Sequence, residues 1–81
     1  MNIAVLTPDK EIFQGAIKSV KVPGSGGQFQ VLKNHAPIVS SLEKGAVTIK
    51  KENGEEMTFE IEKGFIEVLN NEISLLVQGV N

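Results

Sequence analysis

Few side chains in this sequence have the chemistry that catalysis requires. A serine triad combines a hydroxyl, a base and an acid, and Ser25, His35 and Asp9 supply one of each. No nucleophile-elbow pattern surrounds Ser25, however, and the sequence shows no catalytic partners for the histidine. His35, the only histidine, is more simply a loop residue that hydrogen-bonds the backbone or a neighbouring subunit. We therefore predict no catalytic residue.

Neither a metal ion nor a phosphate-bearing cofactor is predicted. With one histidine and no cysteine, only carboxylates remain as ligands, and the glutamates of the second half alternate along a strand edge as a solvated face. These are Glu52, Glu55, Glu56, Glu60 and Glu62. The run Gly24–Gly27 lacks the lysine and hydroxyl that follow a P-loop, and no helix follows it. A tight turn is the better interpretation of this run, because glycine accepts positive φ.

Length and composition indicate a single domain, residues 1–81. Apolar residues make up 41% of the chain, which is enough for a core, while no apolar run approaches the ~20 residues that span a membrane. The lack of cysteine and of a signal peptide at Met1 favours a soluble protein in a reducing, cytoplasmic setting. A net charge of −2, with lysine as the only basic residue type, argues against binding to nucleic acid.

A small β-barrel that binds an oligonucleotide or another ligand is the main alternative from a different functional class. Such barrels stack bases on exposed aromatic side chains. The only aromatic residues here are Phe13, Phe29, Phe59 and Phe65. Of these, Phe59 is predicted to face the core, which makes a stacking platform less favourable.

The hydrophobic pattern predicts an all-β fold of about eight to ten short strands. Residues 2–7 form a first strand, a turn at Pro8-Asp9 follows, and residues 11–13 begin the return. Residues 16–22 form another strand before the glycine-rich run, and residues 29–31 a short one after it. The best helix candidate, residues 40–44, is stopped by Gly45 after about one turn. Strands without helices indicate a sandwich or a closed barrel.

Two hairpins near the carboxyl end can be tested for register. With Glu52-Asn53-Gly54 as a three-residue loop and Gly54 left-handed, the apolar faces of the two strands coincide. The predicted partners are Ile49 with Met57, Val47 with Phe59, and Gly45 with Ile61. In the next hairpin, Asn70-Asn71 serves as a two-residue loop. It pairs Val68 with Ile73, Ile66 with Leu75, and Gly64 with Val77.

The run from Gly26 to Pro37, GGQFQVLKNHAP, resembles the signature of the epsilon subunit of bacterial and plastid rotary ATP synthases. Other points of similarity follow in order along the whole chain. They are Thr7-Pro8, Phe13 with Gly15, Val22-Pro23-Gly24, Gly45, and Lys63-Gly64-Phe65. Two positions depart from the family pattern, which favours glycine where Gln30 stands and proline where Lys33 stands.

The resemblance implies a flattened sandwich of two antiparallel sheets and a non-catalytic role in the central stalk of a proton-translocating ATP synthase. In that role the domain binds the gamma subunit with one side of the sandwich and the c-ring with its loop end, which couples ring rotation to ATP synthesis. Carried over position by position, the gamma contacts are His35, Ala36, Pro37 and Ser40, and the c-ring contacts are Gly27, Gln28 and Phe29. Gln28 stands where relatives are often acidic, so its attraction to a polar ring loop is weaker.

The resemblance also bears on the carboxy-terminal helices of the family and on the location of the protein. A helical hairpin usually follows the sandwich, but this chain ends at Asn81 directly after its last predicted strand. We therefore expect no carboxy-terminal helical hairpin and, without it, no ATP binding. The resemblance places the protein at the cytoplasmic face of the bacterial inner membrane, as a peripheral part of the synthase without direct membrane insertion.

Overall fold

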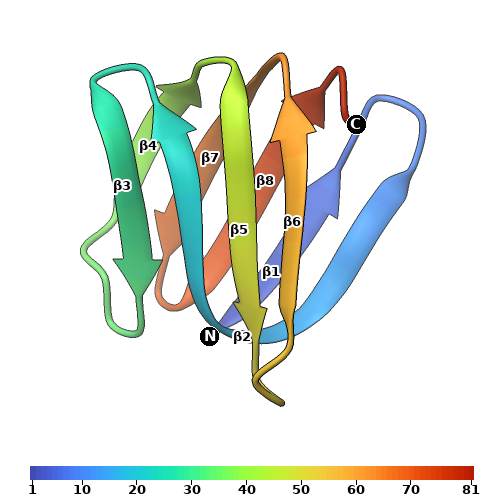
Figure 1. Cartoon of the computed structure of the whole chain (residues 1–81). Coiled ribbons are helices and arrows are strands. Elements are labelled where there is room, and N and C mark those ends of the chain that lie inside the picture. Colours follow the sequence, from blue (N-terminus) through green and yellow to red (C-terminus); the bar gives the residue numbers. More distant parts are fainter.

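The chain folds into two packed β-sheets. The structure, a computed structural model, describes all residues from Met1 to Asn81 and contains eight strands and no helix (Figure 1). The strands are β1 (Asn2–Leu6), β2 (Glu11–Gly24), β3 (Gly27–Leu32), β4 (Ile38–Leu42), β5 (Gly45–Lys51), β6 (Glu56–Ile61), β7 (Lys63–Leu69) and β8 (Glu72–Gln78). The predicted all-β fold and the number of strands are confirmed. Residues 40–44, the best helix candidate, lie mainly in β4.

One layer contains β3, β2, β5 and β6 in that order, and the other contains β4, β7, β8 and β1. The layers are joined by β2, which has 14 residues. Its first half pairs with β1, and its second half pairs with β3 and β5. The sequence predicted two separate segments here, but a register shift between Ile17 and Ser19 bends one continuous strand from layer to layer. Every pair is antiparallel except β1 with β8, which is parallel.

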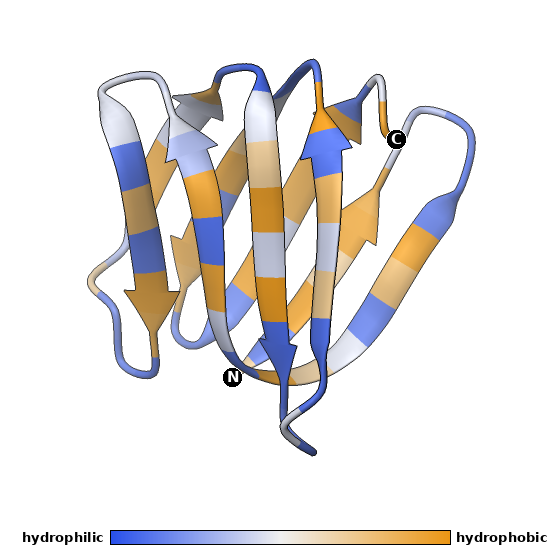
Figure 2. Ribbon diagram, viewed as in Figure 1, coloured by the Kyte–Doolittle hydropathy of each residue, from blue (hydrophilic) through white to orange (hydrophobic).

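The core lies between the layers and consists of side chains from alternate strand positions (Figure 2). Sixteen apolar residues are buried there. They are Ile3, Val5, Ile17, Val20, Val22, Val31, Leu42, Val47, Ile49, Phe59, Ile61, Ile66, Val68, Ile73, Leu75 and Val77. Ser19 is the only buried polar residue. The inward position predicted for Phe59 is confirmed.

The predicted registers of the two carboxy-terminal hairpins are also confirmed. Between β5 and β6, Gly54 has a φ of 92°, and every predicted partner pair is found. Between β7 and β8, Asn70 and Asn71 have φ values of 51° and 63°, as a type I′ turn requires. Asparagine tolerates this left-handed conformation better than most residues, so the turn fixes the register of β7 against β8.

Replacing Gly54 with valine is expected to destabilise the domain by about 1 kcal/mol or more, because a β-branched residue resists positive φ. No atom lies within 4 Å of the position that a Cβ would take, so the effect isolates backbone strain from steric clash. Chemical denaturation measures the change. Glu52→Val in the same loop is the matched control, since Glu52 does not have a positive φ. Equal midpoints for the two variants would contradict the conformation assigned to this loop.

The glycine-rich run forms a tight turn between β2 and β3. Gly24 pairs with Gly27, which leaves Ser25 and Gly26 as the two loop residues. Of the four residues from Gly24 to Gly27, only Gly27 has a positive φ, 127°. Gly24 is required for a steric reason, not for its backbone conformation. A Cβ at this position would lie 2.7 Å from both the carbonyl oxygen of Gly27 and the ring of Phe29. The turn therefore holds the start of β3 close against β2.

Candidate protein-binding surfaces

The predicted contact residues form two groups at opposite ends of β3. Gly27 and Gln28 are exposed at the end of the molecule where β2 turns into β3, and Phe29 beside them is half-buried. His35 lies in the connection from β3 to β4 at the other end (Figure 1). The structure therefore separates the residues assigned to the c-ring from most of those assigned to gamma.

Hydrogen bonds fix the connection between β3 and β4. The His35 N–H donates to the carbonyl oxygen of Leu32 at 3.1 Å, and its Nδ1 lies 2.7 Å from the carbonyl oxygen of Ala36. The Asn34 N–H donates to Asn71 Oδ1 at 2.7 Å, while Asn71 Nδ2 donates to Asn34 Oδ1 at 3.1 Å. This pair of bonds ties the connection to the turn between β7 and β8. His35 therefore lies in a loop whose conformation is fixed by hydrogen bonds.

The other predicted gamma contacts differ in exposure. Ala36 and Pro37 are exposed, directly before β4. Ser40 lies within β4 opposite the buried Ile66, so its side chain is directed toward the layer interface and is half-buried. Its hydroxyl donates to the carbonyl oxygen of Ser41 at 3.0 Å. Ser40 is therefore less accessible to a partner than the sequence suggested.

A second set of hydrogen bonds holds the turn between β2 and β3. The Ser25 hydroxyl donates to Glu43 Oε2 at 3.0 Å and lies 2.9 Å from the Ser41 hydroxyl oxygen. The Ser25 N–H donates to the carbonyl oxygen of Ser41 at 3.1 Å. None of these bonds involves a histidine, so Ser25 positions the turn rather than forming part of a triad.

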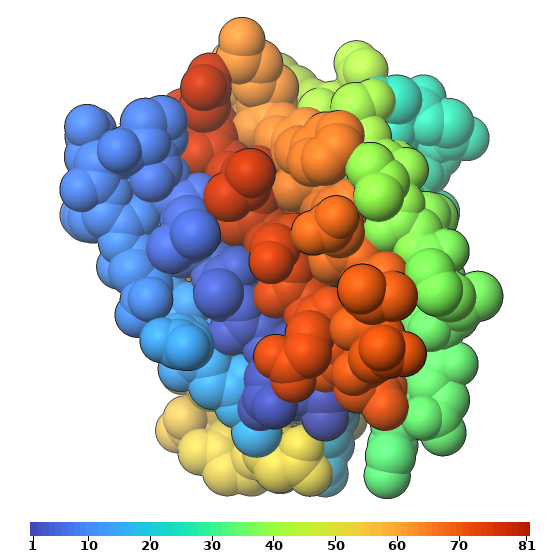
Figure 3. Space-filling model, turned by 180° about the vertical axis from the view of Figure 1, so that it is seen from behind, coloured from blue at the N-terminus to red at the C-terminus, as the bar shows by residue number.

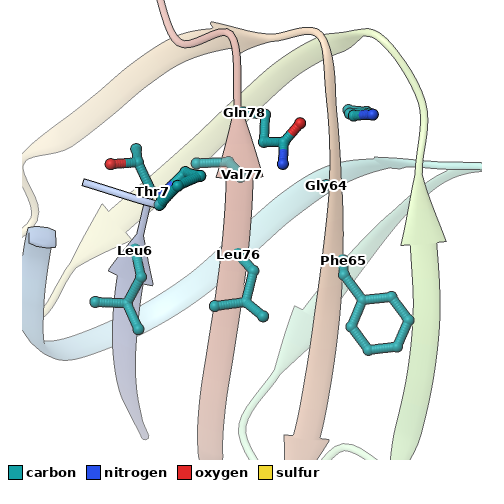
Figure 4. A pocket seen from close by; sticks show the side chains of 9 residues that line it. Leu6, Thr7, Gly64, Phe65, Leu76, Val77 and Gln78 are labelled. Carbon is teal, nitrogen blue, oxygen red and sulfur yellow. The ribbon is translucent and has the colours of Figure 1, made fainter. Parts of the chain in front are cut away.

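An exposed apolar surface that the sequence reasoning missed crosses the outer face of the β4–β7–β8–β1 layer. The strand register places Leu6 beside Leu76 and Leu76 beside Phe65. Figure 3 shows this outer face, and we call these three residues the outer apolar row (Figure 4). Phe65 is 41% exposed and Leu76 46%. The row lines a hollow of about 360 Å³, to which Thr7, Pro8 and Lys63 also contribute.

The sequence does carry a signal for this row. Consecutive apolar residues interrupt the alternation of these strands, as at Val5-Leu6, Phe65-Ile66 and Leu75-Leu76. In each pair one residue is buried, and the other faces outward. A break in the period of two therefore indicates a strand with an apolar side chain on both faces. The same face carries Val39 and Leu69, which are 59% and 54% exposed.

No group of three or more His, Asp or Glu side chains is arranged to hold a metal ion. The structure also has no helix of the length and apolarity that crossing a bilayer requires.

An exposed apolar row on the outer face of one layer, with hydrogen-bonded loops at both ends of the sandwich, characterises a small β-sandwich whose surfaces are suited to binding other proteins. The chain matches the family described as ATP synthase, Delta/Epsilon chain, beta-sandwich domain, over residues 1–81. It belongs to that family, as its resemblance to the epsilon subunit predicted.

Individual relatives agree with this assignment. The ATP synthase epsilon chain of Chlorobaculum tepidum is 44% identical over 80 residues, which cover 99% of this chain and 91% of that relative. The epsilon chain of Leptospira borgpetersenii is 43% identical over 77 residues, which cover 94% of this chain but only 59% of that relative. The chain thus spans nearly all of one relative and about three fifths of another.

Solved structures share the fold. A chain in the Euglena gracilis mitochondrial ATP synthase superposes with a TM-score of 0.89 at 20% identity, over 98% of this chain and 51% of that one. A chain in the central stalk and c-ring of the Tetrahymena thermophila mitochondrial enzyme gives 0.83 at 14% identity, over 99% of this chain and 64% of that one.

Proposed function

We propose that this chain is a non-catalytic, epsilon-type subunit of the central stalk of a proton-translocating ATP synthase. It links the gamma subunit to the c-ring and couples ring rotation to ATP synthesis, as a peripheral component at the cytoplasmic face of a bacterial inner membrane. Family membership supports the assignment to the synthase. The separation of the two contact groups at opposite ends of β3 supports a linking role.

The observation that carries the gamma contact is the outer apolar row. Neighbouring exposed apolar side chains often mark protein-binding sites, and aromatic anchors dominate the energy of many interfaces. The layer that carries the row also includes β4, which follows directly from His35 and Pro37. Val39 on β4 faces outward next to Glu67 on β7, so it extends the same face toward the loop. One partner surface can therefore contact both the row and the loop.

The c-ring contact is assigned to the opposite end of the molecule. Gly27 and Gln28 lie at the β2–β3 turn, which the bonds from Ser25 to Ser41 and Glu43 hold in place. A fixed turn loses little conformational entropy on binding. Gln28 is neutral, so we expect this contact to depend on shape and hydrogen bonding more than on charge.

Two other activities have little support. The hollow beside the outer apolar row has Lys63 as its only positively charged side chain, which is poorly suited to nucleotide phosphates, and we expect no ATP binding. An oligonucleotide module would need several exposed aromatic rings. Only Phe65 is exposed, because Phe59 is buried and Phe13 and Phe29 are half-buried. The Lys51 ammonium lies 5.0 Å from the centre of the Phe13 ring.

Replacing His35 with alanine is expected to weaken binding of the purified gamma subunit several-fold and to leave the melting midpoint nearly unchanged. The imidazole is only half-buried, and its one hydrogen bond is to the adjacent residue, so the fold depends little on it. Isothermal calorimetry measures the affinity. Lys10→Ala, in the exposed turn between β1 and β2, is the control. An unfolded His35 variant would show that the residue is structural.

The experiment that tests the whole proposal is a pull-down of the gamma subunit from the same organism by the purified chain. Retention of gamma, followed by recruitment of the c-ring in detergent, would support the linking role. A chain that retains neither would contradict it. A titration with single-stranded oligonucleotide at low salt tests the alternative activity.

A further inference from the structure

The sandwich has two open sides, and their strand edges are protected differently. At β6 the carboxy-terminal residue Asn81 exchanges two backbone hydrogen bonds with Glu60, at 3.0 and 3.2 Å. The exposed side chains of Glu56, Glu60 and Glu62 add negative charge along this edge. Charged side chains and covering segments are the usual means by which proteins prevent an edge strand from pairing with another chain.

The opposite side has no such protection. β3 pairs only with β2, and β4 pairs with β7 and meets β2 only where Leu42 lies opposite Gly24. Neither strand contains a charged residue or a proline. Their exposed apolar side chains include Leu32 and Val39, at 54% and 59% exposure. An uncharged, regular edge of this kind is a template for strand addition.

The hairpin register shows which backbone groups β3 offers. Gly24 and Gly27 close a two-residue loop, so the alternation of an antiparallel ladder directs the amides of Gly27, Phe29 and Val31 toward β2. The backbone groups of Gln28, Gln30 and Leu32 then point to the open side. The Leu32 carbonyl oxygen already accepts a hydrogen bond from His35. Beyond the turn assigned to the c-ring, the amide and carbonyl groups of Gln30 and the amide of Leu32 remain available to a new strand.

Side chains along this edge indicate what kind of strand would fit. On the inner side, Ile38 is only partly buried against the core, which leaves apolar surface for inward-facing residues of a partner. On the outer side, the exposed Lys21 of β2 pairs with Gln30. Lys33 follows β3, but it lines a hollow that contains both Lys18 and Glu52. An added strand would therefore bring the outward-facing residue beside Gln30 near the positive charge of Lys21.

We propose that β3, beyond the turn assigned to the c-ring, receives an extended segment of a partner subunit as an additional strand, in which apolar residues facing Ile38 alternate with acidic residues near Lys21. This inference rests on the proposed function, since the partner we assign is the gamma-type subunit. It specifies a backbone-mediated contact in addition to the side-chain contacts described above.

Amide hydrogen exchange of the intact chain tests the proposal without any substitution. On addition of purified gamma subunit, the amides of Gln30 and Leu32 are expected to exchange at least about tenfold more slowly, because they become hydrogen-bonded. Amides on the β6 edge, such as that of Thr58, should not change. Binding of gamma with unchanged exchange at Gln30 and Leu32 would overturn strand addition and leave the proposed function intact. Failure to bind gamma at all would overturn both.

A proline substitution provides the second test. Gln30→Pro removes an amide that points away from β2, a position at which an edge strand tolerates proline, and is expected to weaken gamma binding at least tenfold. Gln30→Ala keeps the amide and should stay within threefold of the unsubstituted chain. Thr58→Pro makes the same change on the β6 edge and should also stay within threefold, while circular dichroism confirms folding. Equal affinities for all three variants would refute the proposal. So would a sedimentation experiment that finds a homodimer dissolved by Gln30→Pro, since β3 would then pair with a second copy of this chain.

Discussion

Replacing Phe65 with aspartate is expected to lower the affinity for the gamma subunit by about 100-fold, while the melting midpoint stays nearly constant. The ring is the one aromatic side chain of the outer apolar row and is 41% exposed in the free domain. Truncating an aromatic anchor of an interface commonly costs about 2–4 kcal/mol of binding free energy, and the new carboxylate would also have to be desolvated. Calorimetry or surface plasmon resonance with purified gamma measures the loss.

The matched control introduces the same charge on the opposite layer. Thr58 is exposed on the outer face of β6, away from the outer apolar row. Thr58→Asp should therefore leave the affinity for gamma within about threefold of the original value. Equal affinities for the Phe65 and Thr58 variants would show that gamma does not contact the row. A specific effect at Phe65 would assign the interface to this layer.

Replacing Ile66 with alanine is expected to destabilise the domain by about 2–5 kcal/mol. Ile66 follows Phe65 in β7 but faces the core, where it is fully buried. Removing its outer atoms loses transfer free energy and leaves a cavity, and a domain of this size has little stability to spare. Urea denaturation followed by circular dichroism gives the change. Glu67→Ala, the exposed neighbour, should change stability by less than about 0.5 kcal/mol. A loss of stability at Ile66 no larger than at Glu67 would contradict the assigned strand faces.

The sequence was most informative where a turn and two alternating strands constrained one another. Gly54 and the Asn70-Asn71 turn each allow one register that keeps apolar residues on a common face, and both registers are correct. The path of β2 was harder to predict, because Gln14 and Gly15 interrupt the apolar pattern although the backbone continues as one strand. Its continuity depends on pairing with β1, a tertiary contact that local sequence does not encode.

The candidate site was predicted less completely than the fold. Loop residues could be assigned as contacts through the motif around His35. The structure places His35, Ala36 and Pro37 together in the hydrogen-bonded connection between β3 and β4. The half-buried position of Ser40 was not foreseen, because side-chain direction in a short strand depends on its partner. The outer apolar row joins residues from three strands, so no single stretch of sequence displays it. The roles of all these residues in binding remain predictions.

The continuous path of β2 through both layers has a mechanical consequence. In a sandwich held together only by side-chain packing, a tangential force can shear one sheet past the other. Here such sliding would break the backbone pairing of β2 with β1 on one layer or with β5 on the other, because the same strand is hydrogen-bonded into both. A force applied at the turn that contains Gly27 would therefore reach the far layer through covalent bonds and ladder hydrogen bonds. The shared strand thus opposes movement of one layer relative to the other.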